Sequence, residues 1–185
     1  MSLIEKIGTP VGSYAPDFEL PGIDDQVHHL SRYLEKHRGV GVIFLCNHCP
    51  YVLSYVDRLK QVQDHFQNQG FTLIGINASD AKQDPKESFE NMKKFALANK
   101  LNFPYLWDST QDVAHSFGAE MTPEAFLMDA VGILRYRGRI DDNTQAPEAA
   151  QLLFLQNAIA ALLSGEEVSP KLTQPIGSTL KWRNH

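Results

Sequence analysis

The stretch GVGVIFLCNHCPYVLSYV, residues 39–56, decides the fold of this chain. It opens with an apolar run of strand length, VGVIFL at 40–45. Apolar side chains at helical spacing follow the run and predict a helix that ends at Gly70, namely Val52, Tyr55, Val56, Leu59, Val62 and Phe66. The chain has only two cysteines, Cys46 and Cys49, and both lie where the strand gives way to the helix.

Strands and helices alternate after this stretch. FTLIGIN at 71–77 and FPYLW at 103–107 are typical of strands. The segment between them has an apolar face at helical spacing, made of Phe89, Met92, Phe95 and Ala96. Ser109 is predicted to cap a short helix that carries Val113 and Phe117 and ends at Gly118.

The pattern changes in the last third of the chain. EAFLMD at 124–129 and ILRYRGR at 133–139 flank the turn AVG and predict a hairpin. Pro147 is expected to open a last helix, closed by Gly165, with an apolar face of Leu152, Leu155, Ile159, Leu162 and Leu163. This order predicts an α/β fold with a central mixed β-sheet and helices on both faces.

Length and charge limit the possible architectures and partners. We expect a single domain over 1–185, with an N-terminal extension, a core of about 14–165 and an irregular tail at 166–185. The formal charge of -5 offers no attraction to phosphate or anionic lipid, so no nucleic acid and no membrane partner are expected. No run approaches the roughly 18 apolar residues of a membrane helix, and the N-terminus lacks the pattern of a secretory signal. A cytoplasmic location is therefore expected, where paired cysteines favour catalysis or metal binding.

The position of the cysteines predicts their chemistry. Cys46 lies where a strand feeds a helix N-terminus, and the free N–H groups and positive dipole there lower a thiol pKa below the usual value of about 8.5. Cys49 lies about one turn further on, close enough for a disulfide. We expect Cys46 to be the more exposed and to attack, and Cys49 to resolve. His48 between them can act as a proton donor or as a cation beside the thiolate.

The C-x-x-C pair with Asn47 and His48 at its centre resembles the active site of thioredoxin-like proteins. Thr122-Pro123, directly before a strand, resembles the cis-proline motif that faces the cysteines in that fold. The segment GSYAPDFEL at 12–20 resembles the AhpC/TSA, or peroxiredoxin-like, branch that redoxin and TlpA-type reductases share. The resemblance implies a thioredoxin-like fold, with catalytic Cys46, Cys49, His48 and Pro123 and with substrate-binding Asn47 and Thr122.

Four further motifs, CNHCPYV, NFPYLWD, YRGRIDDN and LKW, together resemble a narrower group of bacterial thioredoxin-family proteins. Members of that group often carry a third cysteine near the C-terminus, where this chain has Ser178. Thioredoxins bury an acid six residues before the first cysteine, where this chain has Val40. Peroxiredoxins have a threonine three residues before the reactive cysteine and an arginine near the cis-proline, whereas this chain has Ile43 and, after Pro123, Glu124.

The residues and the resemblance together predict a thiol–disulfide oxidoreductase that needs no cofactor and no metal. Its expected partners are protein or small-molecule disulfides and a recycling thiol reductant. A histidine before the second cysteine also occurs in strongly oxidising thioredoxin-fold proteins, so we expect His48 to raise the reduction potential above thioredoxin's, which is about -270 mV.

Two alternatives stay open. In a thiol peroxidase with an antioxidant role, Cys46 would be oxidised to a sulfenic acid and Cys49 would condense with it. In a non-enzymatic module, the cysteines would report redox state or hold a metal together with a histidine.

Away from the cysteines, two groups of side chains are interpreted structurally. Phe66, Phe89 and Phe117 are expected in the core, and a solvated hairpin end is expected to hold Arg137, Arg139, Asp141 and Asp142.

Overall fold

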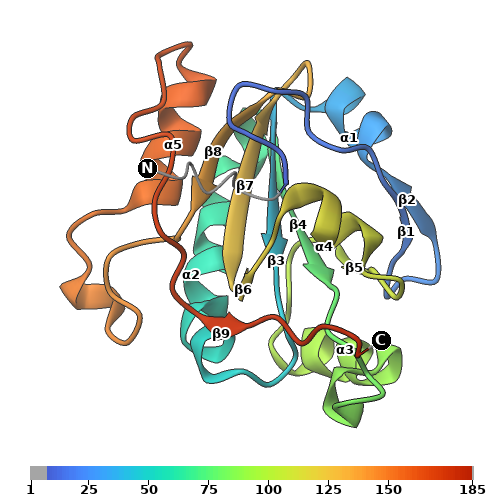
Figure 1. The fold of residues 1–185 in the computed structure, drawn as a ribbon. Coiled ribbons are helices and arrows are strands. Elements are labelled where there is room, and N and C mark those ends of the chain that lie inside the picture. The colour runs from blue at the N-terminus through green and yellow to red at the C-terminus, as the bar shows by residue number, and fades with distance from the viewer. Residues whose placement is uncertain (1–7, 185) are drawn as a thin grey trace, which may run out of the picture.

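A five-stranded mixed sheet forms the centre of the protein in the computed structural model, which describes residues 8–184 (Figure 1). In spatial order its strands are β5 (Tyr105–Trp107), β4 (Phe71–Asn77), β3 (Gly39–Phe44), β7 (Glu124–Asp129) and β8 (Leu134–Gly138). The pairs β3–β4 and β4–β5 are parallel, whereas β3–β7 and β7–β8 are antiparallel. The predicted mixed sheet and its C-terminal hairpin are confirmed.

Helices cover both faces of this sheet (Figure 1). One face packs against α2 (Pro50–Phe66), α3 (Phe89–Ala98) and α5 (Phe154–Leu163), and the other against α1 (Leu30–Lys36) and α4 (Asp112–Phe117). Every residue of β3 and β4 is buried, which explains why their sequences are continuous apolar runs rather than alternating ones. All six apolar residues predicted for the buried face of α2 are buried.

Short elements complete the fold. A small antiparallel hairpin, which the sequence pattern did not predict, joins β1 (Glu19–Pro21) to β2 (Val27–His29). Single 3-10 turns form η1 (Gln67–Gln69), η2 (Pro85–Glu87) and η3 (Pro147–Ala149). Two further short strands, β6 (Met121–Thr122) and β9 (Ser178–Thr179), pair with each other in antiparallel fashion. Among the described residues, no helix has both the length and the apolar character needed to span a membrane.

Two predicted helix starts are wrong. The residue before α4 is Gln111, in the left-handed region at φ 67°, rather than Ser109. Its side-chain amide donates to the carbonyl oxygens of Ala78 and Lys181. The Asp108 carboxylate, rather than the Ser109 hydroxyl, accepts from the N–H of Ala114 in the first turn of α4, at 2.8 Å.

The last helix also begins later than predicted. Pro147 opens only η3, and α5 starts at Phe154. The segment before α5 forms a loop that is tied back to the end of the hairpin. The backbone N–H of Asp142 donates to the carbonyl oxygen of Leu152. Leu152, predicted on the buried face, is 53% exposed.

The charged cluster at the end of β8 is not a solvated hairpin end. Arg137 and Asp141 are buried, whereas Arg139 is half-buried and Asp142 is exposed. The Asp141 carboxylate accepts hydrogen bonds from Arg58 at 2.8 Å and from the Tyr55 hydroxyl at 2.6 Å, both on α2. The prediction was wrong because these partners lie more than 80 residues away in sequence.

Two of the three aromatic side chains predicted in the core are buried. Phe66 and Phe117 are buried, and Phe89 is half-buried, where it stacks on Trp107 with the ring centroids 5.2 Å apart. The core predictions are thus confirmed for two of the three rings.

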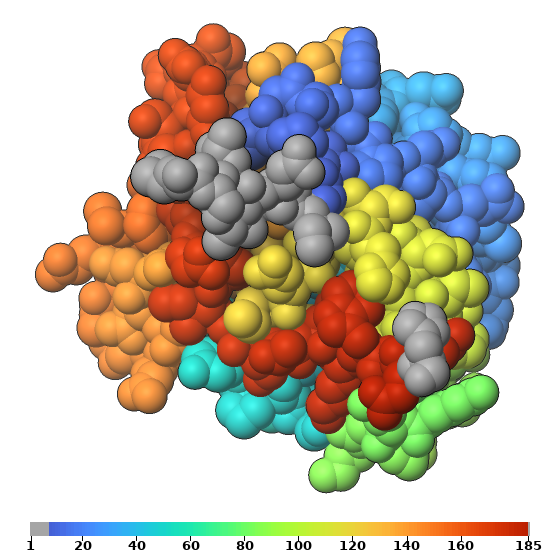
Figure 2. Space-filling model, viewed as in Figure 1, coloured from blue at the N-terminus to red at the C-terminus, as the bar shows by residue number. Residues whose placement is uncertain are grey.

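The C-terminal tail crosses the face of the molecule shown in Figure 2, where it forms a continuous red band. It was predicted to be irregular, but β9 pairs with β6, and Leu180 next to β9 is 2% exposed. The single-domain assignment for 1–185 stays a prediction, and its ends at 1–7 and 185 lie outside the described residues.

Candidate active site

Cys46 and Cys49 form a disulfide in the loop between β3 and α2, with their Cα atoms 6.0 Å apart. That separation lies within the usual range for disulfides. Helix α2 starts at Pro50, where a missing N–H costs no intrahelical bond, and Cys49 is the residue that caps it. The two cysteines are 5% and 6% exposed, so the expectation that Cys46 is the more exposed one is wrong.

The side chain of Thr122 lies against both sulfur atoms. Its hydroxyl oxygen is 3.4 Å from Sγ of Cys46 and 3.5 Å from Sγ of Cys49. The sulfur of Cys49 also lies 3.8 Å from the Thr122 carbonyl oxygen. The Thr122–Pro123 peptide bond is cis, as predicted, and both residues are buried.

These contacts differ for the two cysteines once the disulfide is reduced. The Thr122 hydroxyl lies close to both sulfur atoms and can donate to a thiolate at either one, which stabilises the charged form. A carbonyl oxygen can only accept, so it favours the protonated thiol of Cys49. The surroundings of the pair therefore favour a thiolate at Cys46 and a thiol at Cys49.

Asn47 turns inward and fixes the loop. Its backbone N–H donates to Oε2 of Glu87 at 2.8 Å, and its side-chain amide donates to the Lys86 carbonyl at 2.9 Å. Its side-chain oxygen accepts from the Tyr105 hydroxyl at 2.8 Å, and Asn77 donates to Glu87 at 2.9 Å. Asn47 is 8% exposed, and its substrate-binding role stays a prediction.

Glu87 is a site residue that the sequence analysis missed. It is 0% exposed and sits in η2, which begins directly after the cap residue Asp84. The DPKE sequence at 84–87 carries a helix-start signal, with Asp before Pro, that predicts a turn at this position but not its contact with Asn47.

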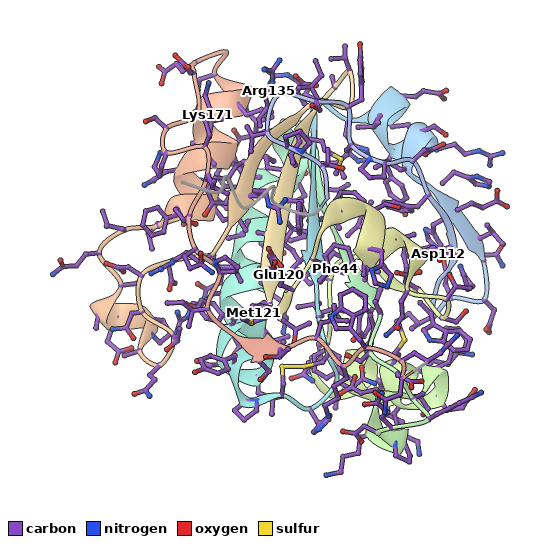
Figure 3. The ribbon with its side chains drawn as sticks, in the orientation of Figure 1. Phe44, Asp112, Glu120, Met121, Arg135 and Lys171 are labelled. Carbon is purple, nitrogen blue, oxygen red and sulfur yellow. A yellow bond between two sulfur atoms is a disulfide. The ribbon has the colours of Figure 1, made fainter. Side chains whose placement is uncertain are left out.

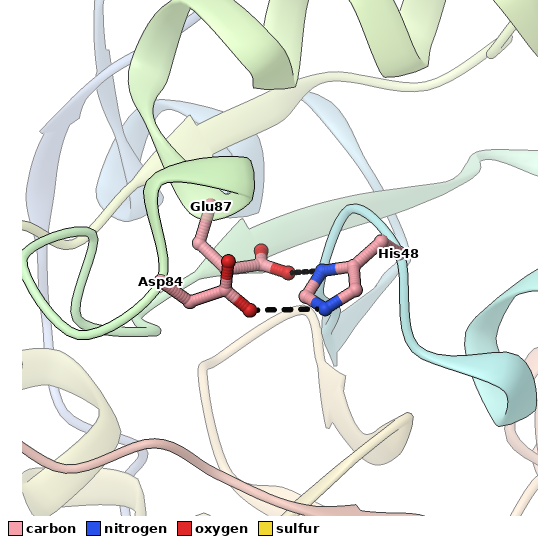
Figure 4. Close-up of side chains that lie close together, drawn as sticks. All are labelled: His48, Asp84 and Glu87. Carbon is pink, nitrogen blue, oxygen red and sulfur yellow. Dashed lines mark hydrogen bonds and ion pairs between the residues drawn. The ribbon is translucent and has the colours of Figure 1, made fainter.

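His48 lies between two carboxylates (Figure 4). Its Nε2 is 3.0 Å from Oδ2 of Asp84, and its Nδ1 contacts Oε1 of Glu87. A neutral imidazole has one N–H, so donating to both carboxylates requires the protonated ring. Lys181 lies 2.5 Å from the same Asp84 oxygen, and its hydrogen bond is the main cause that lowers the pKa of Asp84.

The same three side chains could together approach a cation, since their ligand atoms lie within 4.8 Å of one another. One nitrogen and two carboxylate oxygens would leave a divalent ion short of ligands. The oxygens already bind Lys181, Asn47 and the imidazole, so we assign the cluster to ion pairing. The expected absence of a metal stays a prediction.

The residues after Pro123 form a second buried polar group. Glu124 is 1% exposed, accepts from the Glu120 N–H at 2.8 Å and lies 3.6 Å from Arg137. Burial raises the pKa of Glu124. Arg137 donates to the Gly118 carbonyl at 2.9 Å, so Arg137 is engaged by Glu124 and by the backbone.

Residues 11–137, more than half of the chain, match the AhpC/TSA family. The chain belongs to the AhpC/TSA family. A relative in sequence is the thiol-disulfide oxidoreductase ResA of Geobacillus thermodenitrificans (strain NG80-2), 31% identical over 133 residues that cover 69% of this chain and 68% of the relative.

Solved structures resemble this AhpC/TSA protein over most of its length. An uncharacterized conserved protein from Geobacillus kaustophilus shares 34% identity at a TM-score of 0.88, covering 95% of this chain and 94% of that one. A thiol:disulfide interchange protein of the thioredoxin family from Chlorobium tepidum TLS has 22% identity and a TM-score of 0.58, covering 70% of this chain and 87% of that one. The second likeness shows the thioredoxin-like fold.

The family, the relatives and the Cys46–Cys49 pair together identify the activity class. This AhpC/TSA protein is a thiol–disulfide oxidoreductase, an enzyme whose redox pair is a C-x-x-C disulfide. The predicted fold and activity class are confirmed.

Proposed function

We propose that Cys46 is the nucleophile of this enzyme and that Cys49 is the resolving cysteine. In the reduced protein, the Cys46 thiolate attacks one sulfur of a substrate disulfide, so that a mixed disulfide forms and the other half of the substrate leaves as a thiolate. Cys49 then loses its proton and attacks the Cys46 sulfur. The second half of the substrate leaves, and the Cys46–Cys49 disulfide remains, after two electrons have passed to the substrate.

The observation that carries this assignment is the asymmetry of the Thr122 contacts. Cys46 has the Thr122 hydroxyl as a donor, whereas Cys49 has the Thr122 carbonyl oxygen 3.8 Å away in addition to the hydroxyl. A thiolate at Cys49 would face that carbonyl oxygen, so the first deprotonation is favoured at Cys46. Thr122 in this way positions and polarises the pair.

The substrates are disulfides of proteins or of small molecules, and a thiol reductant returns the two electrons. His48 is proposed as a modulator that raises the reduction potential, and its two carboxylate partners supply the acceptors for a protonated ring. The cytoplasmic location expected from the sequence stays a prediction, which fractionation of cells that express a tagged chain would test.

Trapping tests the assignment of the two cysteines. Cys49→Ser should accumulate mixed disulfides through Cys46 on incubation with intact, disulfide-bonded insulin or with glutathione disulfide, because the resolving thiol is missing. Cys46→Ser, the matched control, should accumulate none. Peptide mapping would contradict the assignment if Cys46→Ser trapped the substrate through Cys49.

Two parallel assays separate this enzyme from its alternatives. A peroxidase would consume hydrogen peroxide orders of magnitude faster than a free thiol does, and a metal-binding module would retain a stoichiometric metal after purification. We expect slow peroxide consumption, because Arg137 is held by Glu124 and the Gly118 carbonyl and Ile43 stands three residues before Cys46.

A further inference from the structure

The C-terminal strand β9 occupies the backbone edge beside the redox pair. It pairs antiparallel with β6, placing Ser178 opposite Thr122 and Thr179 opposite Met121. Thr122 is also the residue whose hydroxyl reaches the sulfur of Cys46. Figure 3 shows the disulfide, drawn as a yellow bond, beside the C-terminal segment and below the labelled Met121. The strand edge nearest to the disulfide is therefore already paired within the chain.

Residues 177–183, here called the strap, are also held beyond the C-terminal end of this pairing. The Leu180 N–H donates to the Glu120 carbonyl at 2.9 Å, which extends the ladder by one residue, and its side chain is buried at 2% exposure. Trp182 stacks on His115 of α4 with the ring centroids 4.1 Å apart. Apolar burial and ring stacking thus hold the strap on the sheet.

Polar contacts tie the strap to the loops around the site. The Lys181 carbonyl accepts from the Asp80 N–H at 3.0 Å and from the Gln111 side chain at 2.9 Å. The Lys181 ammonium group lies 2.5 Å from Asp84, the carboxylate that also contacts His48. The strap is linked through these contacts to the same loop that holds the C-x-x-C turn.

The approach of the strap to β6 depends on a glycine. A Cβ atom on Gly177 would lie 2.4 Å from the carbonyl oxygen of Thr122 and 2.8 Å from its carbonyl carbon. Backbone atoms of a strand cannot move aside easily, so only glycine allows this contact. Any larger side chain at position 177 should push the strap away from β6.

We propose that the strap makes this enzyme selective for small disulfides over extended polypeptides. An extended chain gains affinity by adding a strand to a free sheet edge, where its N–H and C=O groups find partners. Here Ser178 and Thr179 already use that edge of β6. A small disulfide needs no strand edge, so it can reach Cys46 while the strap stays in place. This inference rests on the disulfide exchange proposed above.

The chemistry is the same exchange with a smaller partner. The reduced pair attacks a low-molecular-weight disulfide through Cys46, and one half of that molecule leaves as a thiolate. Cys49 then displaces the other half, which gives the Cys46–Cys49 disulfide and two small thiols. Two electrons move from the pair to the small disulfide, and a thiol reductant restores the pair.

The test measures the rates at which the reduced protein reduces glutathione disulfide and insulin. Thioredoxin is measured in parallel, because its ratio of the two rates corrects for the different intrinsic reactivity of the two substrates. The wild-type protein should prefer glutathione disulfide over insulin at least ten-fold more strongly than thioredoxin does. Gly177→Val should raise the insulin rate at least ten-fold and leave the glutathione disulfide rate within two-fold. Trp182→Ala, which frees the strap at its other end, should act in the same direction.

Lys171→Ala is the matched control, because Lys171 lies in the same C-terminal segment and its side chain pairs with Glu167 on the surface. Hydrogen exchange at the Leu180 amide reports whether each variant has released the strap. The proposal is overturned if the strap is released and the insulin rate does not rise, or if the wild-type protein reduces insulin as readily as thioredoxin does. If the wild-type protein reduces neither substrate, the proposed exchange itself fails.

Discussion

Replacing Thr122 with valine removes the hydroxyl group that lies 3.4 Å from the Cys46 sulfur and keeps the shape of the side chain. A hydrogen bond to a charged group contributes about 1.5–3 kcal/mol, and a long contact to sulfur belongs near the lower end of that range. A free-energy change of about 1.4 kcal/mol corresponds to one pKa unit, so Thr122→Val should raise the pKa of the Cys46 thiol by about one unit.

The same loss should appear in the reduction potential. The thiolate stabilises the reduced form, so losing about 1.4 kcal/mol should lower the potential of the pair by about 30 mV. Titration in glutathione buffers measures the potential, and alkylation of Cys46 as a function of pH, followed by peptide mapping, measures its pKa. Both effects share one cause, so they should appear together.

Thr122→Ser is the control, because it keeps the hydroxyl group and should restore both values. Urea unfolding checks that all three proteins have similar stability. If Thr122→Val is folded and the pKa of Cys46 stays at its wild-type value, the hydroxyl does not stabilise the thiolate and the role given to Thr122 is wrong.

Two further predictions concern ion pairs away from the sulfur atoms. Lys181→Ala should raise the pKa of Asp84 toward its ordinary value of 3.8. A carboxyl group whose pKa is lowered by folding stabilises the fold at pH values above its ordinary pKa of 3.8 and loses this contribution as the pH falls through the lower folded-state pKa. The stability deficit of Lys181→Ala at neutral pH, measured by urea unfolding, should therefore shrink as the pH is lowered below 3.8, and a deficit that does not change with pH would contradict the reasoning. Asp141→Ala should lower the free energy of unfolding by about 3 kcal/mol, because Arg58 stays buried without its carboxylate. The control is Asp57→Ala on the same helix as Arg58, because the Asp57 side chain is 85% exposed and lies 3.9 Å from Lys60; it should change urea stability by less than about 0.5 kcal/mol.

The elements around the cysteines were predictable because their causes are local. The apolar run at 40–45 and the spacing from Val52 to Phe66 reflect strands buried on both faces and a helix buried on one. The resemblance of Thr122-Pro123 to the cis-proline motif predicted the segment that faces the two cysteines. These signals need no knowledge of which segments meet in space.

The contacts that were missed join segments far apart in the chain. Glu87 meets the loop at Asn47 from 40 residues away, and Asp141 meets Arg58 from 83 residues away. Neither carboxylate has a local pattern that distinguishes it from a solvated one. In the sequence, Ser178 stands out only through the resemblance, which implies a cysteine at that position, and its pairing with Thr122 depends on how the tail returns across the sheet.

The buried polar contacts of the C-x-x-C loop have an evolutionary consequence. One buried hydrogen-bond network joins Asn47, Asn77, Glu87 and Tyr105. Each of these residues donates to, or accepts from, another member of the network. Changing one of them alone leaves a buried donor or acceptor without its partner, which costs more than exchanging several together. Across diverging lineages these four positions should therefore be inherited as a unit, and sequences that have lost Glu87 should also have replaced Asn77, whose side chain donates to it.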